Sequence, residues 1–359
     1  MRETAILERD LTRALEEIRP ADEERMAQAR RHWDAVAKPL HGLGLLEDVV
    51  VRMAGVAPLG RDLKKAVAAF CADNGVVAQG VTQCDSSVTA TVSENFTKGN
   101  TSVCAMARAA HADIVPVDIG IEREMNVPGL IDRKIRLGTA DMTKGPAMTR
   151  EEAENAILTG IDMVRRLKEQ GYGIIATGEM GIGNTTTSSA VVSVLMNKPV
   201  EDVTGRGAGL DKAGLNRKVN AIRKAIEVNR PDPSDPIDVL CKVGGLDIAG
   251  IAGAFLGGAI YRAPVVVDGF ISGAAALIAA RLCPAAKCAM FASHVSAEPA
   301  GRMLLDELGL SPMITADMCL GEGTGAVCLF PLLDMGLAVY REMSNFEEAN
   351  IQTYTHFDD

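Results

Sequence analysis

The sequence predicts an α/β fold, with a parallel sheet that carries helices on both faces and a smaller helical domain. First, short apolar runs alternate with helical runs along the middle of the chain, and repeated strand–helix units build a parallel sheet. Second, 47% of the residues are apolar, only 4% are aromatic and 35 are glycine, which is typical of such packed sheets. Third, polar residues directly follow the apolar strands, where these sheets bind ligands: Asp73, Asp118, Glu179, Asp268 and Ser293.

The first 55 residues are highly charged and predict helices that must pack on another part of the chain. Before Pro20, apolar residues from Leu7 to Ile18 recur at the spacing of one helical face. Further helical runs cover residues 21–37 and 46–54. The expected division has three parts: residues 1–55 and 301–359 form the small helical domain, the latter carrying the loop of Glu322, and residues 56–300 form the large α/β domain.

The middle of the chain gives the strands and most of the helices. Thr149 and Glu152 form a capping box that opens a helix to about Lys168. We expect one continuous helix from Ser87 to about Arg108, despite Gly99 inside it. The architecture is therefore Rossmann-like. Strands are expected at residues 66–72, 114–117, 174–176, 265–267 and 289–291, and helices also at 188–196, after 211, after 245, after 269, at 300–308 and at 326–349.

Charge and composition exclude several classes of function. The net charge of −10 argues against a nucleic-acid partner. The longest apolar stretches, residues 248–261 and 269–280, are too short to span a bilayer, so no membrane partner is expected. The eight cysteines form no Cys-x-x-Cys pair and no signal peptide is present, which predicts a cytoplasmic protein with reduced thiols. The five histidines show no metal-ligand spacing, so no metal site is predicted.

A glycine-rich turn between an apolar strand and a helix is the strongest single motif. Gly178 and Gly183 have the spacing of a phosphate-binding P-loop and Thr185 fits it, but Asn184 stands where that motif needs lysine. An ATPase is therefore disfavoured. Glu179 inside the turn would repel a phosphate but would suit a neutral base or a developing cation. The alternative is an ordinary helix N-terminus with good capping residues.

A second acidic residue, Glu322, lies among Gly321, Gly323 and Gly325. One interpretation is a general base that the backbone presents to a ligand. The other is a turn residue that caps the helix expected to start near Ala326. The residues alone leave both open.

Together, residues 178–186 and 321–325 resemble the nicotinate-nucleotide–dimethylbenzimidazole phosphoribosyltransferase family, which acts in cobamide lower-ligand assembly. The resemblance covers residues 36–348 in order and several long motifs. The further matching positions are Lys38-Pro39, Leu43-Gly44, Leu46-Glu47, Asp73, Gly75, Gly80-Val81, Val88–Ala90, Gly205–Gly207, Arg217-Lys218, Gly244-Gly245, Asp268-Gly269 and Ser296–Glu298.

The resemblance implies a donor, an acceptor and two catalytic acids. The donor would be nicotinate mononucleotide, and the acceptor an aromatic base whose ring nitrogen attacks C1′ of the ribose. Nicotinate leaves without an acid, because cleavage cancels the charge of its pyridinium ring, and inversion gives an α-ribotide. Glu322 would take the proton of the acceptor, and Glu179 would orient the acceptor and counter its growing positive charge. No metal or redox cofactor is implied.

The resemblance also assigns the binding residues. The 5′-phosphate would meet backbone N–H groups and a cation, which the matching positions place at Gly205, Arg206, Gly207 and Lys218. Gly181 and Gly183 would line the ribose and nicotinate. The other substrate-binding residues expected from the matching motifs are Met180, Gly269, Ser293, Ser296 and Leu320.

Two positions near the expected acceptor depart from the family pattern. Cys84 and Val92 stand where we expect serine and glutamine in members that use dimethylbenzimidazole, and both changes remove a strong hydrogen-bonding group. His41 and Gly42 replace the usual Gly-Ser of the entry motif. We therefore expect a more apolar acceptor pocket and a preference for other benzimidazoles or phenols.

Two other functions remain open from the sequence. One is a different nucleotide-dependent α/β transferase, against which the missing P-loop lysine argues. The other is a non-catalytic binding protein for nucleotides or cobamide precursors, such as the inactive partner of an active paralogue, in which Glu322 would have no role. The resemblance implies a homodimer, and a heterodimer with a paralogue stays open.

Overall fold

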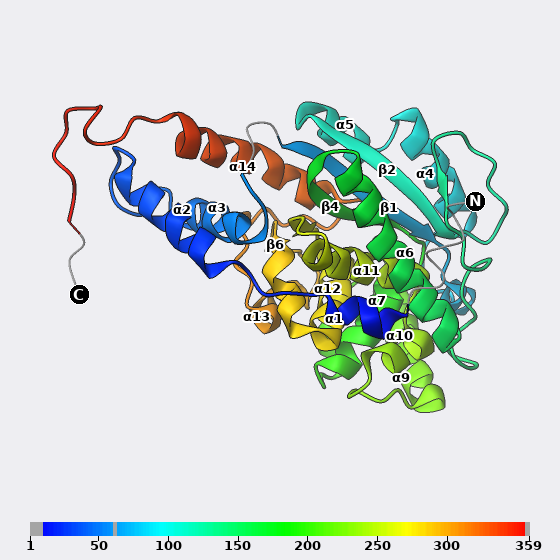
Figure 1. Ribbon diagram of the computed structural model, residues 1–359. Helices are drawn as coiled ribbons and strands as arrows, with labels where there is room; N and C mark the ends of the chain where they lie inside the picture. Colours follow the sequence, from blue (N-terminus) through cyan, green and yellow to red (C-terminus); the bar gives the residue numbers. More distant parts are fainter. Residues whose placement is uncertain (1–9, 60–62, 356–359) are drawn as a thin grey trace.

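The computed structural model describes residues 10–59 and 63–355 and contains one six-stranded sheet in the order β3-β2-β1-β4-β5-β6. Every neighbouring pair of strands is parallel, so the predicted parallel sheet is confirmed (Figure 1). The strands are β1 (Lys64–Ala72), β2 (Ala112–Gly120), β3 (Ile131–Asp132), β4 (Tyr172–Met180), β5 (Val265–Val267) and β6 (Met290–Ala292).

Helices cover both faces of this sheet, as predicted. The α-helices of the described residues are α1 (Leu11–Glu16), α2 (Glu23–Ala35), α3 (Leu45–Val56), α4 (Ser87–Lys98), α5 (Ser102–Ala109), α6 (Arg150–Glu169), α7 (Asn184–Leu195), α8 (Val200–Val203), α9 (Lys212–Asn229), α10 (Pro236–Val243), α11 (Leu246–Ile260), α12 (Phe270–Leu282), α13 (Gly301–Leu308) and α14 (Thr324–Glu342).

The central strand β1 shows how its sequence supports two helical layers. Its residues from Lys65 to Ala72 are buried without interruption, which is typical of a strand covered on both faces. Successive side chains of a strand point to opposite faces. Val67 accordingly lies against Gly323 at the start of α14, whereas Phe70 lies against Gly250 in α11.

Helices α6 and α11 approach each other so closely that glycine is required at the crossing. A Cβ atom on Gly160 of α6 would overlap the backbone oxygen of Gly250, and one on Gly253 of α11 would overlap that of Ile157. The Gly/Ala-rich runs of the sequence therefore let two helices pack backbone to backbone on the sheet.

Several boundaries differ from the sequence-based expectation. The helix expected from Ser87 to Arg108 is two helices, because Gly99 adopts φ 72° as the C-cap of α4 and Thr101 caps α5 through Cys104 N. Helix α7 begins at Asn184 rather than near 188. The last helix ends at Glu342 rather than near 349. Strand β3 is not among the expected strands, and Leu7 lies outside the described residues.

The two ends of the chain lie side by side. Helices α2 and α3 run next to the outer half of α14 (Figure 1), where the ring of Tyr340 lies 4.3 Å from that of His32 and 5.1 Å from that of Trp33. Val36 pairs with Asn345 in a short antiparallel bridge. The proposed domain boundaries at residues 55 and 300 stay predictions.

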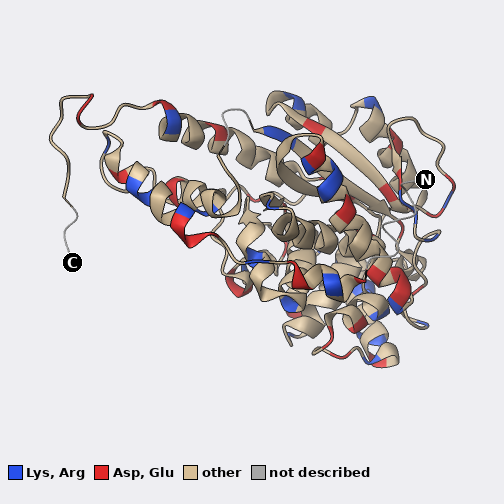
Figure 2. Cartoon of the chain, viewed as in Figure 1, with Lys and Arg blue, Asp and Glu red and all other residues tan. Residues whose placement is uncertain are grey.

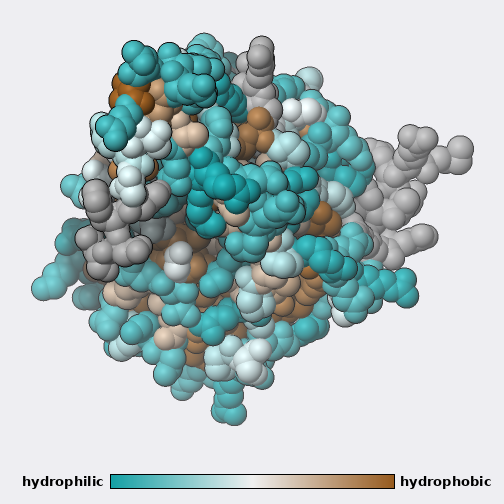
Figure 3. Space-filling model, turned by 60° about the vertical axis from the view of Figure 1, so that its left-hand side comes forward, coloured by the Kyte–Doolittle hydropathy of each residue, from teal (hydrophilic) through white to brown (hydrophobic). Residues whose placement is uncertain are grey.

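The surface carries charges of both signs. Lys and Arg alternate with Asp and Glu over the outer helices in the view of Figure 2, and most of the face in Figure 3 is hydrophilic. Among the described residues, α14 alone is long and apolar enough to cross a bilayer, and 50% of its most apolar window is buried in the fold. Helix α14 therefore serves as a core helix here.

Candidate active site

A cavity of about 320 Å³ lies at the carboxyl ends of β4, β5 and β6. The glycine turn after β4, the loop before α9 and the loop before α14 all contribute to its wall. These are the motifs that the sequence singled out, and they meet in one place. The predicted residues that line the cavity are Cys84, Val92, Glu179, Met180, Gly181, Gly183, Arg206, Gly207, Gly269, Ser296, Leu320 and Glu322.

Three predicted residues, Gly205, Lys218 and Ser293, do not line the cavity themselves. Lys218 reaches it through Thr185, whose side chain is part of the wall. Ser293 is fully buried, and its hydroxyl bonds to the carbonyl oxygens of Val267 and Asp268. The hydroxyl of Ser293 is thus engaged within the protein, and its expected contact with substrate stays a prediction.

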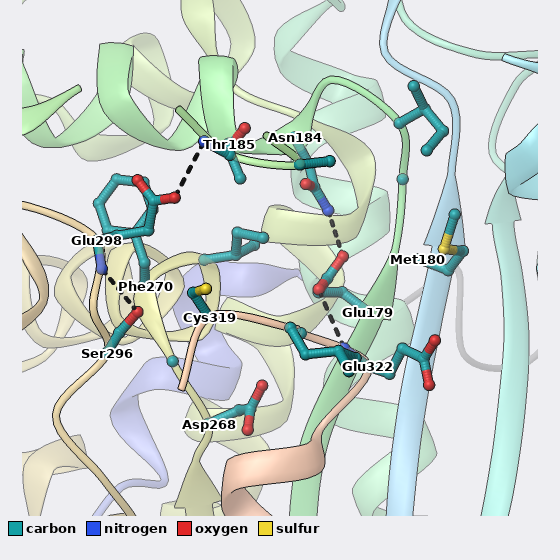
Figure 4. A pocket seen from close by; sticks show the side chains of 18 of the residues that line it. Glu179, Met180, Asn184, Thr185, Asp268, Phe270, Ser296, Glu298, Cys319 and Glu322 are labelled. Carbon is teal, nitrogen blue, oxygen red and sulfur yellow. Dashed lines mark hydrogen bonds between the residues drawn. The ribbon is translucent and has the colours of Figure 1, made fainter. Parts of the chain in front are cut away.

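Glu179 ends β4 and faces the cavity from a buried position (Figure 4). One carboxylate oxygen accepts from the side-chain amide of Asn184, and the other accepts from the backbone N–H of Glu322 at 3.3 Å. The Asn184 amide also donates to Asp247 Oδ2 at 3.1 Å, so it bridges two buried acids. Burial, reinforced by the charge of Asp247, raises the pKa of Glu179 to about 8. Burial thus favours the protonated form of Glu179, which can donate a hydrogen bond.

Two further acids surround this centre. Burial raises the pKa of Asp247 to about 6 and that of Asp268 to about 7. Asp268 lies at the end of β5, lines the cavity and accepts from the backbone N–H of Ala326 at 2.8 Å. Such clustering of acids with perturbed pKa values in one cavity is typical of catalytic sites.

Glu322 is held in a left-handed backbone conformation with φ 62°, between Gly321 at φ 92° and Gly323 at φ 96°. A non-glycine residue rarely adopts this conformation unless the surrounding structure enforces it. Its backbone N–H binds Glu179, and its carboxylate points away from that of Glu179 (Figure 4). The loop thus fixes the backbone position of one acid against the side chain of the other.

The carboxylate of Glu322 accepts from the backbone N–H of Val103 at 3.0 Å, in the first turn of α5. A helix N-terminus stabilises a negative charge there. The alternative that Glu322 caps the helix near Ala326 is wrong, because α14 begins at Thr324 with no side-chain cap. The adjacent Ser102 lines the cavity, so the carboxylate lies beside the wall that also contains Val92.

At the other end, Lys218 of α9 is 1% exposed, and its ammonium group donates to Thr185 Oγ1 at 2.8 Å and to the Gly205 carbonyl at 3.1 Å. Burial lowers its pKa to about 8, which nearby Glu298 opposes. Glu298 Oε1 accepts from Gly207 N at 3.1 Å. The Gly205–Gly207 loop is thus held between a buried cation and an acid.

Sequence reasoning gave no site role to four polar residues found here, although two of them, Asn184 and Glu298, lie in the matching motifs; the other two are Asp247 and His294. In the sequence, Asn184 only breaks the P-loop motif, although in the fold it bridges Glu179 and Asp247. The sequence does contain features that could have indicated the other three residues: Asp247 follows a glycine pair, and His294 and Glu298 lie in the polar stretch after the last strand. Within the described ranges, no group of three or more His, Cys, Asp or Glu side chains could hold a metal ion.

A family model described as Phosphoribosyltransferase matches residues 18–351, which is nearly the whole chain. The chain belongs to this family. The enzyme named nicotinate-nucleotide–dimethylbenzimidazole phosphoribosyltransferase from Ruminiclostridium cellulolyticum is 48% identical over 345 residues, which cover 95% of this chain and 97% of that protein. The enzyme of the same name from Acetivibrio thermocellus is 47% identical over 348 residues, covering 96% and 99%.

Solved structures of the family share this fold. The crystal structure of CobT from Thermus thermophilus matches with a TM-score of 0.86 and 40% identity, covering 92% of this chain and 100% of that one. A second structure, titled as the nicotinate-nucleotide–dimethylbenzimidazole phosphoribosyltransferase of the same organism, gives a TM-score of 0.85, with 92% and 99% covered. The predicted fold and the resemblance to this family are confirmed.

Proposed function

We propose that the protein transfers the 5-phosphoribosyl group of nicotinate mononucleotide to an aromatic base, which releases nicotinate and gives the α-ribotide used in cobamide nucleotide-loop assembly. The observation that carries this proposal is that Glu179 and Glu322 meet in one cavity whose other end lies beside buried Lys218. The names of relatives at 47% and 48% identity, which cover almost all of the chain, support it.

The proposed reaction is a substitution at C1′ of the ribose, in which nicotinate leaves and the acceptor loses one proton. The acceptor's ring nitrogen forms the new bond to C1′ while the bond from C1′ to nicotinate breaks, and that electron pair neutralises the pyridinium ring. The proton on the other ring nitrogen of the acceptor passes to Glu322, which leaves the ribotide base neutral. Its carboxylate lies at the N-terminus of α5 beside the cavity wall, and a general base acts in such a position next to its substrate.

Glu179 would orient the acceptor. Because its pKa is raised to about 8, its carboxyl carries a proton near neutral pH and can donate to a ring atom of the base. To counter positive charge on the acceptor, Glu179 must be ionised. A cation that develops nearby would lower the pKa of Glu179 and so favour its ionised form.

The donor would bind at the opposite end. Lys218 uses two of its N–H bonds on Thr185 and Gly205, which leaves the third for a phosphate oxygen. An adjacent phosphate favours the charged form of the lysine and raises its lowered pKa. Gly181 and Gly183 line the cavity, and the ribose and the nicotinate ring would lie against their backbone.

The wall at the proposed acceptor end is largely apolar. Cys84 and Val92 line it together with Met180 and Leu320, and Leu320 is 56% exposed. Neither Cys84 nor Val92 replaces the hydrogen-bonding groups expected in users of dimethylbenzimidazole. We therefore propose that the preferred acceptors are other benzimidazoles or phenols. A phenol attacks through oxygen and needs Glu322 even more.

We also propose a cytoplasmic homodimer. All eight cysteines are free thiols, which fits a reducing compartment. Large apolar side chains remain exposed where the two ends of the chain meet, which is typical of a subunit contact. These side chains are Leu43, Leu45, Met335, Met343, Ile351 and Tyr354. Light scattering on the pure protein measures its mass in solution and so tests the homodimer. The same measurement on an equimolar mixture with a paralogue tests the heterodimer.

The activity is tested by incubating pure protein with nicotinate mononucleotide and a panel of aromatic bases, with mass spectrometry for α-ribotides and free nicotinate. The proposed function predicts both products in equal amounts. Tight binding of the nucleotide without any release of nicotinate would instead favour the non-catalytic binding protein.

A further inference from the structure

His294 is a cavity residue with no role in the chemistry above. It follows β6, is 3% exposed and contributes to the cavity wall. Its ring occupies the space that Gly325 leaves at the start of α14, because a Cβ atom on Gly325 would overlap Nδ1 and Cε1. On the other side, Nε2 and Cε1 lie 3.5 Å from the position of a Cβ on Gly269. The two glycines therefore fix the ring in one orientation.

The hydrogen bonds of Ser293 determine which ring nitrogen carries the proton. Ser293 Oγ lies 2.7 Å from the Val267 carbonyl, 3.0 Å from the Asp268 carbonyl and 3.0 Å from His294 Nδ1. A hydroxyl has one hydrogen, and carbonyl oxygens only accept, so that hydrogen goes to a carbonyl. Ser293 Oγ must then accept from Nδ1–H. The lone pair of the ring is therefore on Nε2.

The ring is also neutral. Burial lowers the pKa of His294. The ring lies beside the first residues of α12 and α14, whose N-termini disfavour a cation. Asp268, whose backbone carbonyl also contacts Ser293 Oγ, has its own pKa raised to about 7 by burial, and its carboxylate accepts from the N-terminus of α14. Within the part of the chain that the structure describes, nothing donates to Nε2, which is left as an acceptor at the cavity wall.

Ser296 supplies a donor next to this acceptor. Its Oγ accepts from Glu298 N at 3.3 Å, so its own hydrogen is available to a ligand. Ser296 Oγ lies 3.6 Å from the same Gly269 Cβ position that is 3.5 Å from Nε2. An acceptor and a donor thus flank one small space. A hydroxyl group satisfies both, whereas an ionised phosphate or carboxylate oxygen has no hydrogen for Nε2.

We propose that His294 Nε2 and Ser296 Oγ recognise a ribose hydroxyl of the donor nucleotide, so that the enzyme selects ribonucleotides over deoxyribonucleotides. Ser293 is the positioning residue that keeps Nε2 unprotonated. This inference rests on the proposed function, because that function supplies a ribose within the same cavity. A site built to bind a hydroxyl leaves its buried groups unpaired with an analogue that lacks it, and so rejects the analogue strongly.

The test compares nicotinate mononucleotide with its 2′-deoxy and 3′-deoxy analogues, one acceptor being held constant. For the wild-type enzyme, kcat/KM is expected to fall about tenfold or more for one of the two analogues, which identifies the hydroxyl. His294→Asn keeps a hydrogen-bond partner for Ser293 but removes the acceptor at the position of Nε2. The kcat/KM values for the ribonucleotide and the deoxy analogue should therefore become nearly equal. His294→Gln places an amide oxygen near the position of Nε2 and should retain most of the preference.

Ser293→Ala is a second test, because it leaves the His294 ring in place but removes the hydroxyl that keeps the proton on Nδ1. It should lower the preference partly and make it depend on pH. Equal kcat/KM for all three donors with the wild-type enzyme would overturn the inference even if no variant folds. An equal loss on all donors in His294→Asn would overturn it too. Neither result touches the proposed function, which fails only if the wild-type enzyme releases no nicotinate from nicotinate mononucleotide itself.

Discussion

Replacement of Glu322 by glutamine is the most direct test of the proposed base. Glutamine has the same shape, and its amide oxygen can still accept from Val103 N, as the carboxylate does at 3.0 Å. The backbone N–H of residue 322 still binds Glu179. The variant therefore keeps the fold and the cavity, and loses only the ability to take a proton at neutral pH.

The magnitude follows from the role of a general base, which typically contributes about 10²–10⁴-fold to the rate. At about 1.36 kcal/mol per tenfold change, this corresponds to roughly 3–5 kcal/mol in the activation barrier. We expect kcat of Glu322→Gln to fall by this factor, while the dissociation constant for nicotinate mononucleotide stays within about twofold, as expected for a group that acts on the other substrate.

Assays quenched at fixed times and analysed by liquid chromatography measure kcat, and calorimetry measures nucleotide binding. Glu227→Gln, at an exposed position on α9, is the matched control and should behave as the wild type. If Glu322→Gln turns over at the wild-type rate, Glu322 is not the base. If nucleotide binding falls in parallel with kcat, the residue serves the donor site instead.

Three further changes test the site and the packing. Between about pH 5 and pH 8, Glu179 of the folded wild type holds a proton that the unfolded chain releases, so the free energy of unfolding falls as the pH rises through this window. Glu179→Gln should lose this part of the pH dependence, which urea titrations at pH 5 and at pH 8 measure. Cys84→Ser combined with Val92→Gln should shift acceptor choice towards dimethylbenzimidazole in a two-base competition, and the idea of an altered preference is wrong if the wild type already prefers that base. Gly160→Ala should destabilise the protein by about 1–3 kcal/mol or more in the same urea titrations, because the methyl group overlaps the backbone of Gly250, and an unchanged midpoint would contradict the described helix crossing.

The fold could be predicted because its signals are local. Alternation of apolar strands with helices indicated the parallel sheet, and the capping box at Thr149 formed as expected. Two of the differences described above have clear physical causes. Gly99 adopts a left-handed C-cap that a helical pattern alone does not reveal, and β3 has only two residues, too few for any periodicity.

Several residues that line the candidate cavity could be recognised in the sequence because glycine turns mark them. What could not be predicted depends on contacts between distant segments. The carboxylate of Glu322 binds the backbone of Val103, 219 residues away in the chain, and the bridge from Glu179 to Asp247 exists only once β4 and α11 are in place. The tautomer of His294 likewise depends on two carbonyls of another strand end.

The anchoring of Glu322 has a consequence for how such an enzyme diversifies. Its backbone is fixed by a buried acid and the start of α14, whereas Cys84 and Val92 lie on a separate loop and helix of the same wall. Mutations at those two positions can reshape the chamber without moving the backbone that holds Glu322. If Glu322 is the proposed base, a lineage can thereby explore new acceptor rings by single steps, without passing through an inactive ancestor.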